Sequence, residues 1–157
     1  MQGTEIAVQN GDFELGCNFG TSLYNSTASD TTLAANGTVG CRVCYTSGVY
    51  GFYTSFSVPL IVVPGETYDV VACVRSAPDQ DAAAAITVFA QLAVADNGFP
   101  GAPVAVSASY VPARVSWNVM ASYPSVELEV RSASEVPGTC FVVDDVRLLR
   151  VRDAGPG

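Results

Sequence analysis

The sequence contains no histidine and no lysine, so all seven of its basic residues are arginine. Histidine is the commonest general base and metal ligand near neutral pH. Its absence removes Ser-His and Cys-His nucleophile pairs and histidine-based zinc sites, so we expect no conventional hydrolase chemistry. Fifteen acidic residues give a formal net charge of −8, which repels phosphate backbones and argues against a nucleic-acid partner.

Long apolar runs are missing as well. The hydrophobic fraction is 49%, yet it comes largely from dispersed Ala and Val, and no run approaches the roughly 18 residues of a membrane helix. We therefore expect no membrane insertion. The start after Met1 lacks the basic and apolar regions of a signal peptide. Either a leader has been removed from this sequence, or the protein never passes through the general secretion route, which a virus particle assembled in the cytoplasm would fit. We expect an extracellular or virion-surface protein.

Helical periodicity is almost absent, and 157 residues suit one ordinary domain. Short alternating segments separated by turn residues predict roughly nine or ten strands at the spacing of an all-β sandwich. We expect one domain over 1–151, a tail or linker over 152–157, a turn at 78–81 and a long surface loop over 18–37. The expected strands are 5–9, 12–15, 38–45, 50–58, 67–75, 86–94, 104–110, 114–120, 126–131 and 141–149.

Five cysteines are present, an odd number: Cys17, Cys41, Cys44, Cys73 and Cys140. If four of them pair, one thiol is left over, and the sequence does not give the connectivity. The Cys41-to-Cys44 spacing matches a metal or redox pair, but no second such pair, no histidine and no following helix support it. We expect buried cysteines with one or two disulfides.

Two acidic-aromatic segments lie at the ends of the chain, NGDFELG at 10–16 and FVVDDVRLL at 141–149. They predict a sheet whose first and last strands meet, with the Asn10-Gly11 pair as a tight turn inside the opening segment. Such a sheet would bring carboxylates from both ends of the sequence near one another.

These segments, together with GTVGCRVCYTSG, VPGETYDVVACVR and a single tryptophan at Trp117, resemble the jelly-roll carbohydrate-binding modules found beside bacterial xylanases and cellulases. Similar domains occur on phage surface proteins. The similarity covers nearly the whole chain and is more specific for fold than for ligand. It implies an all-β, antiparallel jelly-roll β-sandwich.

In such modules a first-strand glutamate and a C-terminal aspartate commonly hold a structural calcium ion. By position, the resemblance implies Glu14 with Asp144 or Asp145 as calcium ligands, and Asp12 as a further candidate. Hard carboxylate oxygens suit Ca²⁺. On a regular strand Asp144 and Asp145 point to opposite faces, so one of them at most would face the site. The alternative is that these acids line a sheet edge or accept hydrogen bonds from loop amides.

Sugar-binding modules use exposed aromatic faces together with polar side chains that bond the hydroxyls. Many members of the resembled family carry a tryptophan shortly after the opening motif, where this chain has Cys17, Asn18 and Phe19. Alternation puts Tyr50 and Phe52 on one face and Tyr53 on the other, so one set should be exposed. The residues expected to bind a ligand are Tyr50, Tyr53, Phe19 and Tyr24; Trp117 is expected in the core.

Three functions compete. The first is a non-catalytic carbohydrate-binding module acting as a surface-displayed binding or adhesion domain, with a glycan as its partner. The second is a structural decoration protein of a phage capsid or tail, with neighbouring subunits as partners. The third is an enzyme, which we do not favour: Glu127 and Glu129 share a strand face, but a solvent-facing pair explains them more simply than a glycosidase dyad.

Overall fold

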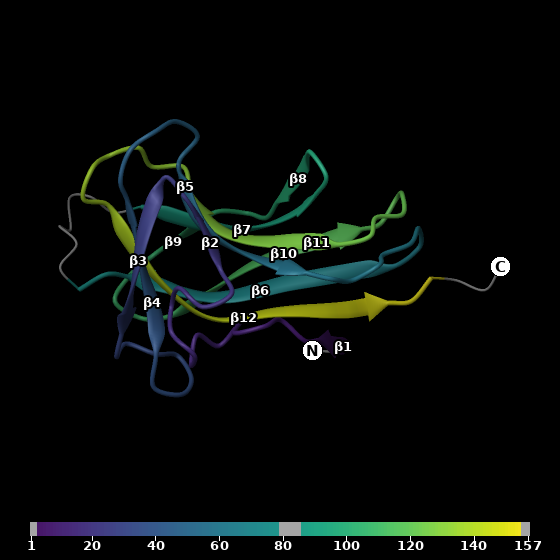
Figure 1. Ribbon diagram of the computed structural model, residues 1–157, viewed down its shortest axis with the longest axis horizontal. Coiled ribbons are helices and arrows are strands. Elements are labelled where there is room, and N and C mark those ends of the chain that lie inside the picture. The colour runs from purple at the N-terminus through teal and green to yellow at the C-terminus, as the bar shows by residue number, and fades with distance from the viewer. Residues whose placement is uncertain (1–2, 79–85, 155–157) are drawn as a thin grey trace.

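The computed structural model describes residues 3–78 and 86–154. In these residues two antiparallel sheets pack face to face as a sandwich (Figure 1), which confirms the expected all-β fold. The strands are β1 (Thr4–Ile6), β2 (Ser22–Tyr24), β3 (Ser26–Thr31), β4 (Gly40–Tyr45), β5 (Phe52–Val58), β6 (Thr67–Ser76), β7 (Thr87–Val94), β8 (Asn97–Pro100), β9 (Val104–Ala105), β10 (Val111–Asn118), β11 (Val126–Ser132) and β12 (Cys140–Arg152).

We call the two layers sheet A and sheet B. Sheet A has the order β10-β6-β12-β4-β3, and β1 adds to β12. Sheet B has the order β2-β5-β11-β7-β8, and β9 adds to β7. Neighbours in both sheets are mostly distant in sequence, as the crossing connections of a jelly roll require. The described part of the chain contains no helix long and apolar enough to cross a membrane.

The first and last strands do meet, because β1 pairs with β12 from Thr4 opposite Arg150 to Ile6 opposite Leu148. In Figure 1 the N-terminal strand accordingly lies along the long yellow β12. The expected strand over 12–15 is wrong: this segment is a series of turns. Asn10 causes the difference, since its side-chain amide donates to the carbonyls of Gly16 and Phe19 and its oxygen accepts from the amide of Leu15.

The segment 18–37, expected as one loop, contains β2 and β3, which are polar edge strands that an apolar alternation cannot reveal. Between the strands expected over 86–94 and 104–110 the structure adds β8, and of the strand expected over 104–110 only β9 forms. Most of the turn expected at 78–81 and the end of the expected tail lie outside the described residues. Arg152, counted in that tail, still pairs with Thr67.

The core between the sheets is built from rings and branched side chains on the inward positions of the strands. Phe13, Phe52, Phe56 and Phe141 are fully buried, and Phe13 meets Phe56 edge to face with ring centroids 5.4 Å apart. Trp117 is also in the core, as expected, between the rings of its neighbours. Burial of these large apolar surfaces supplies the main driving force for the fold.

Two disulfides anchor β4. Cys17 pairs with Cys41, and Cys44 pairs with Cys140, so the two closely spaced cysteines of β4 have different partners. This connectivity rules out a shared metal or redox role for them. Cys73 on β6 is the remaining thiol and is half-buried. Burial raises the pKa of this thiol, and the nearby carboxylates of Asp145 and Asp144 add to the increase.

Candidate functional site

An aromatic and arginine row crosses the face of sheet B that points away from sheet A; we call this surface the outer face of sheet B. Tyr24 on β2 lies opposite Tyr53 on β5, Tyr53 lies opposite Arg131 on β11, and Arg131 lies opposite Phe89 on β7. The strand pleat places all four side chains on the same side, while their chain neighbours Phe52, Val130 and Val88 enter the core.

The row is a continuous stack. The rings of Tyr24 and Tyr53 are nearly parallel, 14° apart, with centroids 5.1 Å from each other. The guanidinium of Arg131 covers Tyr53 at 4.9 Å from its centroid and Phe89 at 5.7 Å. Because Tyr53 has neighbours on both sides, its flat faces are not free for a ligand. Tyr24, 37% exposed at the sheet edge, retains an accessible ring.

Tyr50 stands beside this stack on the loop before β5. Tyr50 and Gly51 are consecutive residues in the left-handed region, with φ of 69° and 72°. They break the strand alternation, so Phe52 is buried while Tyr50 is 77% exposed. The expected shared face of Tyr50 and Phe52 is therefore wrong. A non-glycine residue in this region is strained and needs support from its surroundings.

Side chains from two other elements supply that support. Arg131 donates from Nη2 to the carbonyl of Tyr50 at 2.9 Å. Asn25, between β2 and β3, donates from Nδ2 to the carbonyls of Val49 at 2.8 Å and Gly51 at 3.0 Å. The loop is thus fixed on both sides of Tyr50, whose backbone lies next to Arg131 of the row and whose ring is exposed.

A polar row lies next to the stack on the same face. Glu129 is only 5% exposed, and its Oε1 accepts from Arg131 Nη1 at 2.9 Å and from Gln91 Nε2 at 3.0 Å. Burial raises the pKa of Glu129, and Arg131 opposes that shift. Burial also raises the pKa of Tyr53, with Glu129 and Glu127 as further causes. The expectation that Glu129 faces solvent is wrong, whereas its shared face with Glu127 is confirmed.

Three of the four residues expected to bind a ligand come together here: Tyr24, Tyr50 and Tyr53. Phe19 is 49% exposed in the turn before β2, and its ring stacks on none of the described rings. The sequence reasoning missed Arg131 and Phe89. The alternation of β11 could have found Arg131, because it places that residue on the face of the two glutamates.

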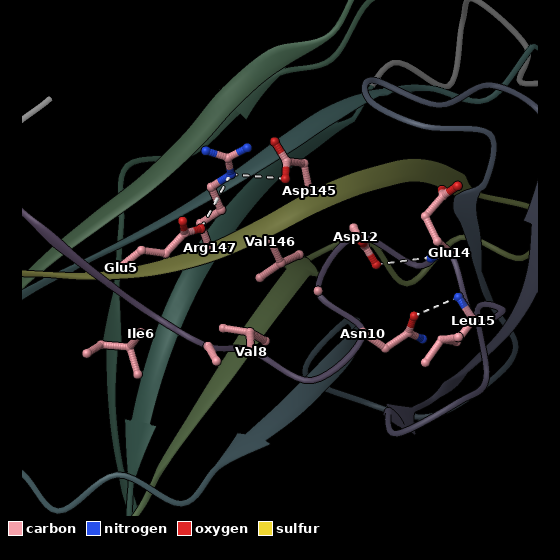
Figure 2. A pocket seen from close by; sticks show the side chains of 12 residues that line it. Glu5, Ile6, Val8, Asn10, Asp12, Glu14, Leu15, Asp145, Val146 and Arg147 are labelled. Carbon is pink, nitrogen blue, oxygen red and sulfur yellow. Dashed lines mark hydrogen bonds and ion pairs between the residues drawn. The ribbon is translucent and has the colours of Figure 1, made fainter.

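A second concave site lies where the chain ends meet. A pocket of about 550 Å³ is bounded by the N-terminal segment and the middle of β12. Figure 2 shows Arg147 between the carboxylates of Glu5 and Asp145, at 3.8 and 3.0 Å, with Asp12 and Glu14 at the other end. Three of the four expected calcium ligands therefore line this pocket: Asp12, Glu14 and Asp145.

The carboxylates of this region hold the loop before β4. Glu14 accepts from the amides of Thr38 and Val39, both at 2.8 Å, and from the Thr38 hydroxyl at 2.8 Å. Buried Asp144 accepts from the amides of Ala35 and Asn36 at 2.8 and 3.1 Å. These backbone bonds lower the pKa of Glu14, whereas burial raises that of Asp144.

Asp145 reaches the same loop, because its Oδ2 accepts from the Asn36 side chain at 2.9 Å. A bulge in β12 and a φ of 54° at Asp145 break the strict alternation expected for the two aspartates. No three acidic, cysteine or histidine side chains among the described residues are close enough to hold a metal ion. The arrangement of these carboxylates therefore fits hydrogen bonding to loop amides better than ligation of calcium. Calcium binding stays a prediction from the family resemblance.

No protein-family model and no curated protein matches the sequence. Solved structures do match the fold. The CBM22-1 xylan-binding domain of Xyn10C from Paenibacillus barcinonensis is 15% identical, with a TM-score of 0.74 over 98% of each chain. A cyclase from Fischerella sp. TAU is 10% identical, with a TM-score of 0.79 over 99% of this chain and 100% of that one.

A third similar structure is TmCBM61 in complex with β-1,4-galactotriose, which is 13% identical with a TM-score of 0.61. It matches over 91% of this chain and 97% of that chain. Identities this low establish the fold alone, and the neighbours include both sugar-binding modules and a cyclase. The chain thus has the antiparallel jelly-roll sandwich fold that these solved structures share.

Proposed function

We propose that the protein is a non-catalytic glycan-binding module that uses the outer face of sheet B. The observation that carries the proposal is the exposed ring of Tyr50, fixed in a left-handed loop by Arg131 and Asn25. Strain of this kind is maintained where the presented side chain has a use. An exposed, pre-positioned ring suits stacking against the apolar face of a pyranose.

The polar side chains next to the rings suit the hydroxyls of the same ligand. The exposed Ser57, the half-buried Glu127 and the amide of Gln91 lie on the outer face of sheet B. Small residues, among them Ser57 and Gly98, project little from this part of the outer face of sheet B. The surface therefore leaves room for an extended glycan chain to lie across the strands. Sugar-binding structures with this fold support the proposal, while the cyclases with it show that fold alone does not decide function.

The test is retention on a panel of insoluble polysaccharides and a glycan array. We expect the wild-type protein to be retained on at least one polymer, and Tyr50→Ala to lose about tenfold or more in affinity, the worth of a well-placed ring. Met120→Ala is the matched control, since Met120 is 85% exposed and lies after β10, off the binding face. Absence of retention on every polymer would refute the proposal.

Display on an outer surface is part of this proposal, as an extracellular module that reaches insoluble or cell-surface glycans. The decoration-protein alternative has no supporting observation in the fold or its neighbours. Copurification with intact virus particles at fixed stoichiometry would support it.

A further inference from the structure

The charges of the outer face of sheet B restrict the glycans that it can accept. Among the described residues, the strands of this face carry one cation, Arg131, and two carboxylates, Glu127 and Glu129. The other six arginines lie on strands of sheet A: Arg42, Arg75, Arg114, Arg147, Arg150 and Arg152. Since the sequence contains neither lysine nor histidine, no other basic side chain is available to the face.

Two nitrogens of Arg131 are engaged within the protein, and the third, Nε, is buried without a hydrogen-bond partner in the described part of the chain. One nitrogen, Nη1, bonds Glu129, and Nη2 bonds the carbonyl of Tyr50. Its guanidinium plane lies over Tyr53 and near Phe89, and its side chain is 16% exposed. A ligand carboxylate or sulfate needs paired N–H donors directed at it. Arg131 does not present such a pair, because Nε is buried and both Nη atoms bond groups of the protein. Its role is to position Tyr50 and Tyr53.

The carboxylate of Glu127 is not neutralised in this way. Glu127 is half-buried on β11 and forms no ion pair with any described residue. Its neighbours on β5 and β7 are Ser57 and Ala93, which bring no charge. Since Arg131 compensates Glu129, the face keeps one uncompensated negative charge. An anionic ligand would meet this charge after losing part of its own hydration.

We infer that the outer face of sheet B takes uncharged glycan chains and rejects those that carry carboxylates or sulfates. This inference rests on the proposed function, because it names the ligand class of the same face. Glu127 acts in it as a specificity-determining residue, accepting hydrogen bonds from sugar hydroxyls and repelling anionic substituents.

The test uses a polysaccharide that the wild-type protein retains, in a hydroxyethyl and a carboxymethyl derivative of equal substitution. These differ in charge and little in bulk. At low salt we expect binding to the carboxymethyl polymer to be about fivefold weaker or more, the effect of one like charge at about 4 Å in water. At about 1 M salt, where the screening length is near 3 Å, the two affinities should converge.

Glu127→Lys tests the residue that carries the discrimination. In this variant the affinity for the hydroxyethyl polymer divided by that for the carboxymethyl polymer should fall by about tenfold or more, because one negative charge is replaced by a positive one. Glu5→Lys makes the same change of net charge on β1 of sheet A and should leave the ratio within twofold. Equal or tighter binding of the carboxymethyl polymer by the wild type, or an equal effect of both variants, would overturn the inference and leave glycan binding intact. Failure to retain any polymer would instead refute the proposed function, and the inference with it.

Discussion

Single residues in the left-handed region decide where side chains of this protein point. Phe13, Asn25, Tyr50 and Asp145 all have positive φ without being glycine. At each of these positions the positive φ gives the side chain a direction that a regular strand would not give it. Phe13 enters the core, Asn25 reaches the Tyr50 loop, and Asp145 turns toward Asn36. Their strain is offset by burial and by hydrogen bonds to their neighbours.

Gly51 is the residue on which the presentation of Tyr50 depends. A Cβ at Gly51 would lie 2.0 Å from the Ser132 carbonyl oxygen, and φ is +72°. We predict that Gly51→Ala lowers the free energy of unfolding by about 2 kcal/mol or more, through strain and displacement of β5 from β11. Urea unfolding measures this change.

Gly138→Ala is the matched control for that variant. Gly138 also has a positive φ, of +87°, but nothing lies within 4 Å of its hypothetical Cβ. Its substitution should lower the free energy of unfolding only by the strain of a non-glycine residue at positive φ, about 1 kcal/mol. Equal losses from the two variants would contradict the close-approach explanation for Gly51.

At the scale of elements, the loop before β4 is held by carboxylates from both ends of the chain. Glu14 comes from the N-terminal turns, and Asp144 and Asp145 come from β12. The hydroxyl of Tyr110 also donates to the carbonyl of Leu33 in this loop. The acidic motifs at the two ends of the sequence therefore act on one structural element, the loop before β4.

The pH dependence of Glu14 gives a test of this arrangement. Its folded pKa lies below the unfolded value of about 4.3. The ionised side chain therefore stabilises the fold above the unfolded pKa, and this contribution is lost as the pH falls through the lowered folded pKa. We predict that Glu14→Gln has a lower free energy of unfolding than wild type at pH 7. The difference between the two free energies should become smaller near pH 3, as measured by urea unfolding.

The exposed Glu135, on the loop after β11, supplies a control for the Glu14 measurement. Glu135→Gln should differ little from wild type at either pH. A Glu14→Gln gap that stays constant between pH 7 and pH 3 would contradict a role for the ionised carboxylate.

Calcium dependence can be measured on the same element. Because the oxygens of Glu14 and Asp144 already accept loop amide hydrogens, we expect a chelator and millimolar calcium to give the same melting temperature within about 1 °C. A rise of several degrees with calcium would show that the carboxylates bind the ion. That result would confirm the assignment implied by the family resemblance.

At the scale of the whole molecule, sheet A is closed by the long strand β12, which contacts β1, β4 and β6 along its length. The two disulfides add covalent links to the same region. The sandwich therefore depends on contacts between residues far apart in sequence, and β12 makes many of these contacts.

The two disulfides should differ in their contribution to stability. Cys44 and Cys140 are 96 residues apart, whereas Cys17 and Cys41 are 24 apart. In the chain-entropy model, closing these loops lowers the entropy of the unfolded chain and stabilises the fold by about 4.7 and about 3.5 kcal/mol, respectively. We predict that replacing the Cys44–Cys140 pair by alanine destabilises the protein more than replacing the other pair, in urea unfolding under oxidising conditions. The reverse order would show that lost packing outweighs loop closure.

Sequence alone determined the fold class, the position of most core strands and the meeting of the chain ends. Alternation of branched and aromatic residues is a local property, and it identified strands such as β6, β7 and β11. The absence of lysine and histidine likewise determined that every basic side chain of the protein is an arginine. These conclusions need no knowledge of long-range contacts.

Tertiary structure alone decided the details of the site. Polar edge strands such as β2 and β3 exist because neighbouring strands supply their hydrogen bonds, which no local pattern records. The row of Tyr24, Tyr53, Arg131 and Phe89 depends on the register of four strands that are distant in sequence. The exposure of Tyr50 depends on positive φ angles maintained by Arg131, about 80 residues away along the chain.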